Sequence, residues 1–145
     1  MPADDANLIY WNNSLVADFG ESAGLLLYNG SNWQWLASGC VNEMIVWDGK
    51  LVVDFGQDNG LYYYDGTWSW LTNWGGTSDM MVWNDGSGEN LAVDFGGGRG
   101  MSYHDGTGWT WMSNWDDTND MQVWSDNGTG KASGRLWRRQ WRICL

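Results

Sequence analysis

Tryptophan is the residue type with the clearest chemical potential in this chain, since 14 of its 145 residues are Trp. A flat indole ring stacks on the C–H face of a sugar, while the sugar hydroxyls need Asp, Asn or backbone partners. Trp74 and Trp115 each follow an asparagine and open a polar loop that ends in an aspartate. A related segment has Gly39 at this place, so we expect the ring to be dispensable for folding and to lie on the surface. The predicted ligand-binding residues are therefore Trp74, Trp115, Asn73, Asn114, Asp79 and Asp120.

Most other tryptophans are predicted to pack rather than to bind. Pairs at i and i+2 are separated by Gln34, Ser69 or Thr110, and this spacing places both rings of a pair on one face of a strand. The pairs recur at the same place in related segments: Trp33 and Trp35, Trp68 and Trp70, Trp109 and Trp111. This recurrence predicts a role in the core.

No catalytic residues are predicted. The sole histidine, His104, stands where related segments have Tyr28 and Tyr64, so we expect an exposed residue at a strand end rather than a base. Glycoside hydrolysis requires two carboxyl groups in different environments. The aspartate that recurs in each unit, such as Asp54, is expected to have the same environment in every copy, so it does not predict a glycosidase. We expect such aspartates to bond backbone amides at strand ends. No nucleophile motif or phosphate-binding glycine loop is present.

The acidic loops do not predict a metal site. The segment 115–120 holds three aspartates, whereas the matching segment 74–79 holds one, so a repeated calcium site is not expected. We predict neither a metal nor a cofactor for this chain.

These residues belong to a sequence unit that occurs three times. Asp-Phe-Gly begins at Asp18, Asp54 and Asp94, which gives a period of 36 and then 40 residues. Repeats of this length bury their apolar faces by stacking on copies of themselves.

Four short runs of β-branched, aromatic and aliphatic residues make up each unit. Around the middle copy they are Leu51 to Phe55, Leu61 to Tyr64, Trp68 to Leu71 and Met80 to Trp83. The dipeptides Asn29-Gly30, Asp65-Gly66 and Asp105-Gly106 recur between two of these runs and supply tight hairpin turns. The unit is thus predicted to be a four-stranded antiparallel sheet.

The repeats set the domain organisation. We predict a β-repeat domain over residues 1–130, with units at about 7–38, 43–74 and 79–115 and an extra strand near 120–124. Residues 131–145 form a basic, Trp-rich C-terminal tail. A short amphipathic helix and an edge strand are both possible for this tail.

The unit length, its four strands and its Trp-rich hairpins resemble the tachylectin and tectonin group of lectin-like β-propellers over about residues 7–126. The resemblance implies an all-β propeller whose blades are the repeats and whose function is multivalent carbohydrate binding without enzymatic activity. A propeller needs about four to eight blades, so three would be completed by oligomerisation, with a dimer giving six. A β-trefoil or β-prism is the alternative architecture, and a structural or protein-interaction scaffold is the alternative function.

Charge restricts the partners. The first 130 residues carry 18 acidic side chains against Lys50 and Arg99, and the last 15 residues carry five basic ones. An acidic body repels nucleic acid and anionic membranes, so neither is an expected partner, and we expect the tail to dock on the body. No secretory signal is visible, which makes the cytoplasm the default expectation. Cys40 and Cys144 have no metal-site spacing; we expect two unrelated thiols, with a bridge between them as the alternative.

Overall fold

The computed structural model describes residues 8–57, 59–115, 120–126 and 129–135; beyond residue 119 it describes the backbone and the side chain of Met121. The described residues form β-strands, turns and loops without a helix, which confirms the all-β prediction. They therefore hold no helix that could span a membrane.

Three four-stranded antiparallel sheets follow one another along the chain, and in each the strands lie in sequence order. The first sheet contains β1 (Leu8–Trp11), β2 (Ser14–Asp18), β3 (Leu25–Tyr28) and β4 (Trp33–Ala37). The second contains β5 (Glu43–Trp47), β6 (Lys50–Asp54), β7 (Leu61–Tyr64) and β8 (Trp68–Thr72). The third contains β9 (Asp79–Asn84), β10 (Glu89–Asp94), β11 (Met101–His104) and β12 (Trp109–Ser113).

The extra strand predicted near 120–124 has a partner. β13 (Asp120–Asp126) pairs antiparallel with β14 (Thr129–Arg135) in a two-stranded sheet beside β9. β14 extends past residue 131, where we predicted the tail to begin, so this part of the tail continues the β structure. The rest of the tail, 136–145, lies outside the described residues.

Turn chemistry explains the hairpins. Gly30, Gly66 and Gly106 all have φ near +100° or above (99°, 117° and 99°), which confirms the role predicted for the Asn-Gly and Asp-Gly dipeptides. Asp48 and Gly49, both with positive φ, join β5 to β6 in a two-residue turn.

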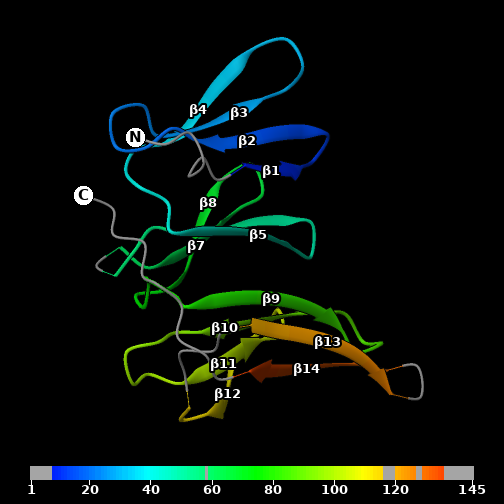
Figure 1. Cartoon of the computed structure of the whole chain (residues 1–145). Coiled ribbons are helices and arrows are strands. Elements are labelled where there is room, and N and C mark those ends of the chain that lie inside the picture. The colour runs from blue at the N-terminus through cyan, green and yellow to red at the C-terminus, as the bar shows by residue number, and fades with distance from the viewer. Residues whose placement is uncertain (1–7, 58, 116–119, 127–128, 136–145) are drawn as a thin grey trace.

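The sheets stack face to face, with β1, β5 and β9 neighbouring one another through the stack (Figure 1). Between the first and second sheets lies an apolar cluster that includes Val16 and Leu25 on one side and Leu51 and Val53 on the other. A second cluster fills the space between the second and third sheets; it includes Val52, Leu61, Leu71, Leu91, Val93 and Phe95. The cores of this molecule therefore lie between sheets.

Indole N–H groups join the stacked sheets in both directions. Trp11 donates to the carbonyl of Gly49 at 2.9 Å, and Trp47 donates to that of Glu89 at 3.0 Å, each toward the following sheet. Trp68 donates to the carbonyl of Leu36 at 3.1 Å, toward the preceding sheet. These rings bury apolar area and satisfy a backbone acceptor together, which explains much of the tryptophan content.

Asp54 is a second link between segments. Its fully buried carboxylate accepts hydrogen bonds from the amides of Gly56, Gly76 and Thr77, from the Thr77 hydroxyl and from the Asn42 side chain, at 2.7–2.9 Å. Asp18 and Asp94 accept from the amides of Gly20 and Gly96. The predicted structural role of these aspartates is confirmed.

Cys40 is disulfide-bonded. The expectation of two unrelated thiols was therefore wrong for Cys40, and Cys144 lies outside the described residues.

Candidate functional site

The predicted surface position of Trp74 is confirmed. Trp74 follows β8, and its backbone N–H donates to the hydroxyl of Thr72 at 3.3 Å, which turns the chain at the strand end. The indole is about half exposed, and its ring lies 5.3 Å from that of Phe95 at an interplanar angle of 78°. Gly75 follows with its Cα hydrogens against the backbone of Gly56, where a side chain would not fit.

Arg99 fixes this loop from the third sheet. Its guanidinium donates to the carbonyls of Gly75 at 3.1 Å and Phe95 at 2.8 Å, and its carbon Cζ lies 6.0 Å from the centre of the Trp74 ring. The Trp74 ring is therefore held by an edge contact and a cation–π contact before any ligand arrives.

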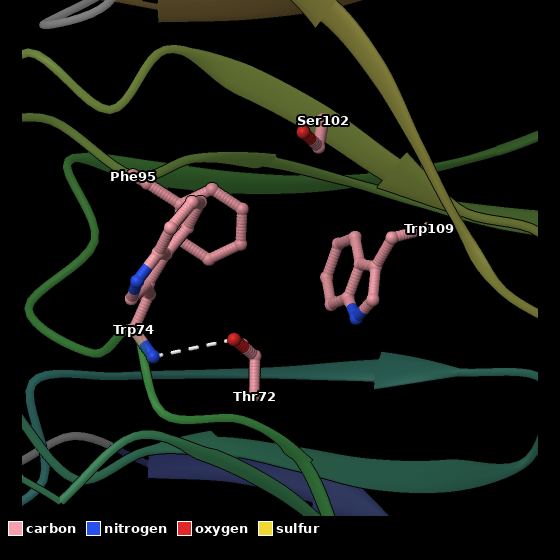
Figure 2. Close-up of a pocket in the computed structure, with 5 residues that line it drawn as sticks. All are labelled: Thr72, Trp74, Phe95, Ser102 and Trp109. Atoms are coloured by element: carbon pink, nitrogen blue, oxygen red, sulfur yellow. Dashed lines mark hydrogen bonds between the residues drawn. The ribbon is translucent and has the colours of Figure 1, made fainter.

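A cavity of about 180 Å³ lies beside this ring, between the second and third sheets. Trp74 and Phe95 stand on one side and Trp109 on the other, with the hydroxyls of Thr72 and Ser102 between them (Figure 2). Trp109 is oriented by its indole N–H, which donates to the carbonyl of Leu71 at 3.3 Å. The lining thus combines three aromatic rings with two hydroxyls.

The equivalent junction between the first and second sheets lacks the Trp74 ring. Phe55 and Trp68 occupy the places of Phe95 and Trp109, and their rings lie 5.5 Å apart as in the cavity. Gly39 stands in the place of Trp74; its φ is +100°, and a Cβ added to it would have no atom within 4 Å. The two described junctions share the Phe–Trp ring pair but differ in the other three lining positions, because Ala37, Gly39 and Tyr62 replace Thr72, Trp74 and Ser102.

Trp115 repeats the local geometry of Trp74. Its backbone N–H donates to the hydroxyl of Ser113 at 2.9 Å, and its side chain is exposed, as predicted. Residues 116–119, which follow it, lie outside the described residues. The described part of this loop therefore presents a second ring of the same kind.

Among the described side chains, the other predicted ligand residues do not line the cavity with Trp74. Asn73 is exposed and its Oδ1 accepts the Trp70 indole N–H at 3.2 Å. Asp79 is buried and its Oδ1 accepts the backbone N–H of Met80 at 3.0 Å. Asn114 is exposed beside Trp115, and Asp120 begins β13 with its side chain outside the described set. Of the six predicted residues, Trp74 alone lines the described cavity.

Sequence reasoning missed Phe95, Trp109, Thr72 and Ser102 in the cavity lining. Phe95 belongs to Asp-Phe-Gly, whose recurrence we attributed to folding, and Trp109 belongs to a predicted packing pair. Both rings do pack, since the ring centres of Phe95 and Trp109 lie 5.5 Å apart. The same two rings also line the cavity.

His104 ends β11, as predicted, but the expectation that it is exposed was wrong. The imidazole is partly buried between Trp47 and Trp109, with ring centres 5.1 and 5.0 Å away, and its Nδ1 accepts the backbone N–H of Gly106 at 3.0 Å. Burial lowers the pKa of His104, while the charge of Asp105 raises it by a smaller amount and Lys50 lowers it further. These contacts make His104 a packing residue.

The packing role predicted for the paired tryptophans is correct for Trp68 and Trp109, which bond to the preceding sheet. It is wrong for Trp33, which is exposed, and for the second ring on each outer strand. These second rings are exposed to a similar extent in all three sheets: Trp35, Trp70 and Trp111. Two rings on the same face of a strand are therefore not always both buried, because a neighbouring sheet can cover the first ring of the pair and leave the second exposed.

Among the described residues no group of three or more His, Cys, Asp or Glu side chains forms a potential metal site. No protein-family model, curated protein or solved structure matches the chain.

Proposed function

We propose that this chain is a non-enzymatic carbohydrate-binding protein and that the cavity at Trp74 is a sugar site. The observation that carries the proposal is the half-exposed, pre-positioned Trp74 ring at the mouth of an aromatic cavity with two hydroxyls. Small-ligand sites combine such apolar walls with a few polar groups that fix orientation.

The chemistry of the lining favours a sugar over other small molecules. Indole and phenyl rings offer apolar area to the C–H faces of a pyranose, and the hydroxyls of Thr72 and Ser102 offer hydrogen bonds to its own hydroxyls. The described lining of the cavity consists of Thr72, Trp74, Phe95, Ser102 and Trp109, none of which is an ordinary general acid or base.

The finer architecture that we propose is a β-propeller whose blades are the stacked sheets, completed by a homo-oligomer, for which a dimer is the simplest case. This proposal agrees with the sequence resemblance to tachylectin and tectonin propellers. Sites at successive junctions then act together, so that individually weak sugar contacts gain strength by avidity. Trp115 repeats the turn of Trp74 and is the proposed ring of a second site.

A glycan array tests the sugar-binding proposal. We expect reproducible signals that disappear in the Trp74→Ala, Trp115→Ala double variant. Trp70→Ala, Trp111→Ala is the matched control, since it removes two exposed indoles that do not line the cavity. Circular dichroism establishes that all proteins are folded. An array without signals, or signals that both double variants reduce equally, would count against the proposal.

A protein-interaction scaffold is the second candidate, favoured by the exposed Trp35, Trp70 and Trp111 on the outer strands β4, β8 and β12. Exposed tryptophans at equivalent positions in an acidic protein suit a basic partner with apolar contacts. Under this alternative the control pair, rather than Trp74 and Trp115, would be essential for binding.

A further inference from the structure

One end of the sheet stack exposes an apolar face. The first sheet turns Trp11, Val16 and Leu25 toward the second sheet. Because side chains alternate along a strand, its other face carries the neighbours of these residues. Six large apolar side chains on or next to the first sheet are exposed. Trp35 is set apart, because its equivalents Trp70 and Trp111 are exposed as well; the other five are Leu8, Tyr10, Leu15, Phe19 and Trp33. We call these five residues the open face.

The same positions are covered in the other two sheets. Leu15 is 37% exposed, whereas its equivalents Leu51 and Leu91 are 0% exposed. Phe19 is 51% exposed, whereas Phe95 is 2% exposed. The open face therefore has the composition of an internal interface and differs only in lacking the preceding sheet.

Trp33 shows the same difference in hydrogen bonding. Its equivalents Trp68 and Trp109 donate their indole N–H groups to carbonyls of the preceding sheet. Trp33 is 48% exposed, and among the described residues its ring contacts are with rings of its own sheet region, Tyr28 at 5.0 Å and Phe19 at 5.4 Å. A covering sheet would supply both apolar contact and an indole acceptor at this position.

We infer that a second copy of this chain covers the open face. The two internal interfaces show which surface fits it, namely the face of a preceding sheet that presents Trp47, Val52, Leu61 and Leu71. In a second copy the last described sheets of the stack are the third repeat sheet and the two-stranded β13–β14 sheet beside it. The contact joins the start of one stack to the end of another, which is a heterologous contact that closes into a ring or continues.

Electrostatics gives this association a distinctive signature. Each copy carries a net charge of −11, so two copies repel one another, while the open face that one of them contributes to the contact is apolar. Added salt screens the repulsion and leaves the apolar contact intact. Association is therefore expected to strengthen as salt is raised, the opposite of docking driven by opposite charges.

Sedimentation velocity on the full chain, over a range of protein and salt concentrations, tests the inference. We expect a mass that is a multiple of 16.4 kDa and that increases with protein and with salt concentration. Trp33→Ser and Phe19→Ser should each weaken association by about tenfold or more, because each removes a large ring from the contact. Trp35→Ser is the matched control, since this indole is 59% exposed on the same strand and belongs to no internal interface.

A wild-type chain that stays monomeric at all concentrations would overturn the inference and would indicate that another segment or another protein covers the open face. Equal loss of association in Trp33→Ser and Trp35→Ser would also overturn it. If Trp33→Ser fails to fold, Leu8→Ser replaces it, because Leu8 is 60% exposed on the edge strand β1 and makes a smaller change. Sugar binding enters none of these outcomes.

Discussion

Among single residues, the buried aspartate Asp54 joins several segments of the chain by hydrogen bonds. Asp54 is fully buried and accepts five hydrogen bonds, one from the nearby Gly56 and four from two segments more distant in sequence, at Asn42 and at Gly76 and Thr77. An unpaired buried donor costs about 1–3 kcal/mol, so the loss of this acceptor leaves several such costs at one point.

We therefore predict that Asp54→Ala lowers the free energy of unfolding by about 3 kcal/mol or more. Asp18→Ala is the control, because the described part of the chain gives Asp18 one hydrogen bond, from the amide of Gly20. Its loss should be clearly smaller. Urea unfolding followed by tryptophan fluorescence measures both values. Equal losses would show that the bonds of Asp54 to Gly76, Thr77 and Asn42 contribute nothing measurable.

His104 makes the stability depend on pH. Burial lowers the pKa of this imidazole below its ordinary value of 6.5, so the unfolded chain binds the proton more readily than the folded one. The stabilising contribution is complete above 6.5 and is lost as the pH falls from 6.5 through the lowered value.

His104→Tyr, the residue type of the two related segments, removes this titration. Between about pH 8 and about pH 5.5, the variant should lose less unfolding free energy than the wild type. Chemical denaturation at several pH values measures the difference between the two proteins, in which the other titrating groups cancel. Parallel pH profiles would contradict the assignment of a lowered pKa to His104.

At the scale of elements, glycines at the entry to the third strand of each sheet allow the outer strand to approach. Gly24, Gly60 and Gly100 have φ of +82°, +85° and +78°, and a Cβ at each would meet a backbone carbonyl of the outer strand, at Ala37, Thr72 or Ser113. The loop that carries Trp74 begins at Thr72, so Gly60 also influences the candidate site.

Gly60→Ala should reduce unfolding free energy by more than about 2 kcal/mol, because the positive φ alone costs about 1–2 kcal/mol and the contact with Thr72 adds to it. Gly66→Ala, at φ of +117° with no atom within 4 Å of the new methyl group, isolates the conformational cost. Thermal unfolding compares the two. A Gly60 variant no less stable than the Gly66 variant would disprove the close approach.

At the scale of the whole molecule, the repeat predicted the strands and their turns because these depend on local residue types. Three four-stranded sheets and the positive φ of Gly30, Gly66 and Gly106 follow from that local chemistry. The comparison between copies also predicted that Trp74 lies on the surface. This part of the prediction needed no knowledge of how the sheets stack.

What the sequence could not predict depends on stacking. Asp79 and Trp70 are the clearest cases, since one is buried and the other exposed contrary to their expected roles. Whether a ring on a strand face is covered depends on how far the next sheet reaches, and a one-dimensional pattern does not contain this distance. The cavity likewise forms between two units, so its residues Thr72 and Phe95 come together only in the stack.

A titration of nitrogen-15-labelled protein with the best glycan from the array, observed through the indole N–H resonances, shows directly whether a sugar binds at Trp74. We expect saturable shifts for Trp74 and Trp109, which line the cavity, with the Trp74 signal assigned by Trp74→Phe, and no shift for Trp35. Shifts confined to Trp35, Trp70 and Trp111, or no saturable shift with any glycan, would contradict a sugar site at this cavity.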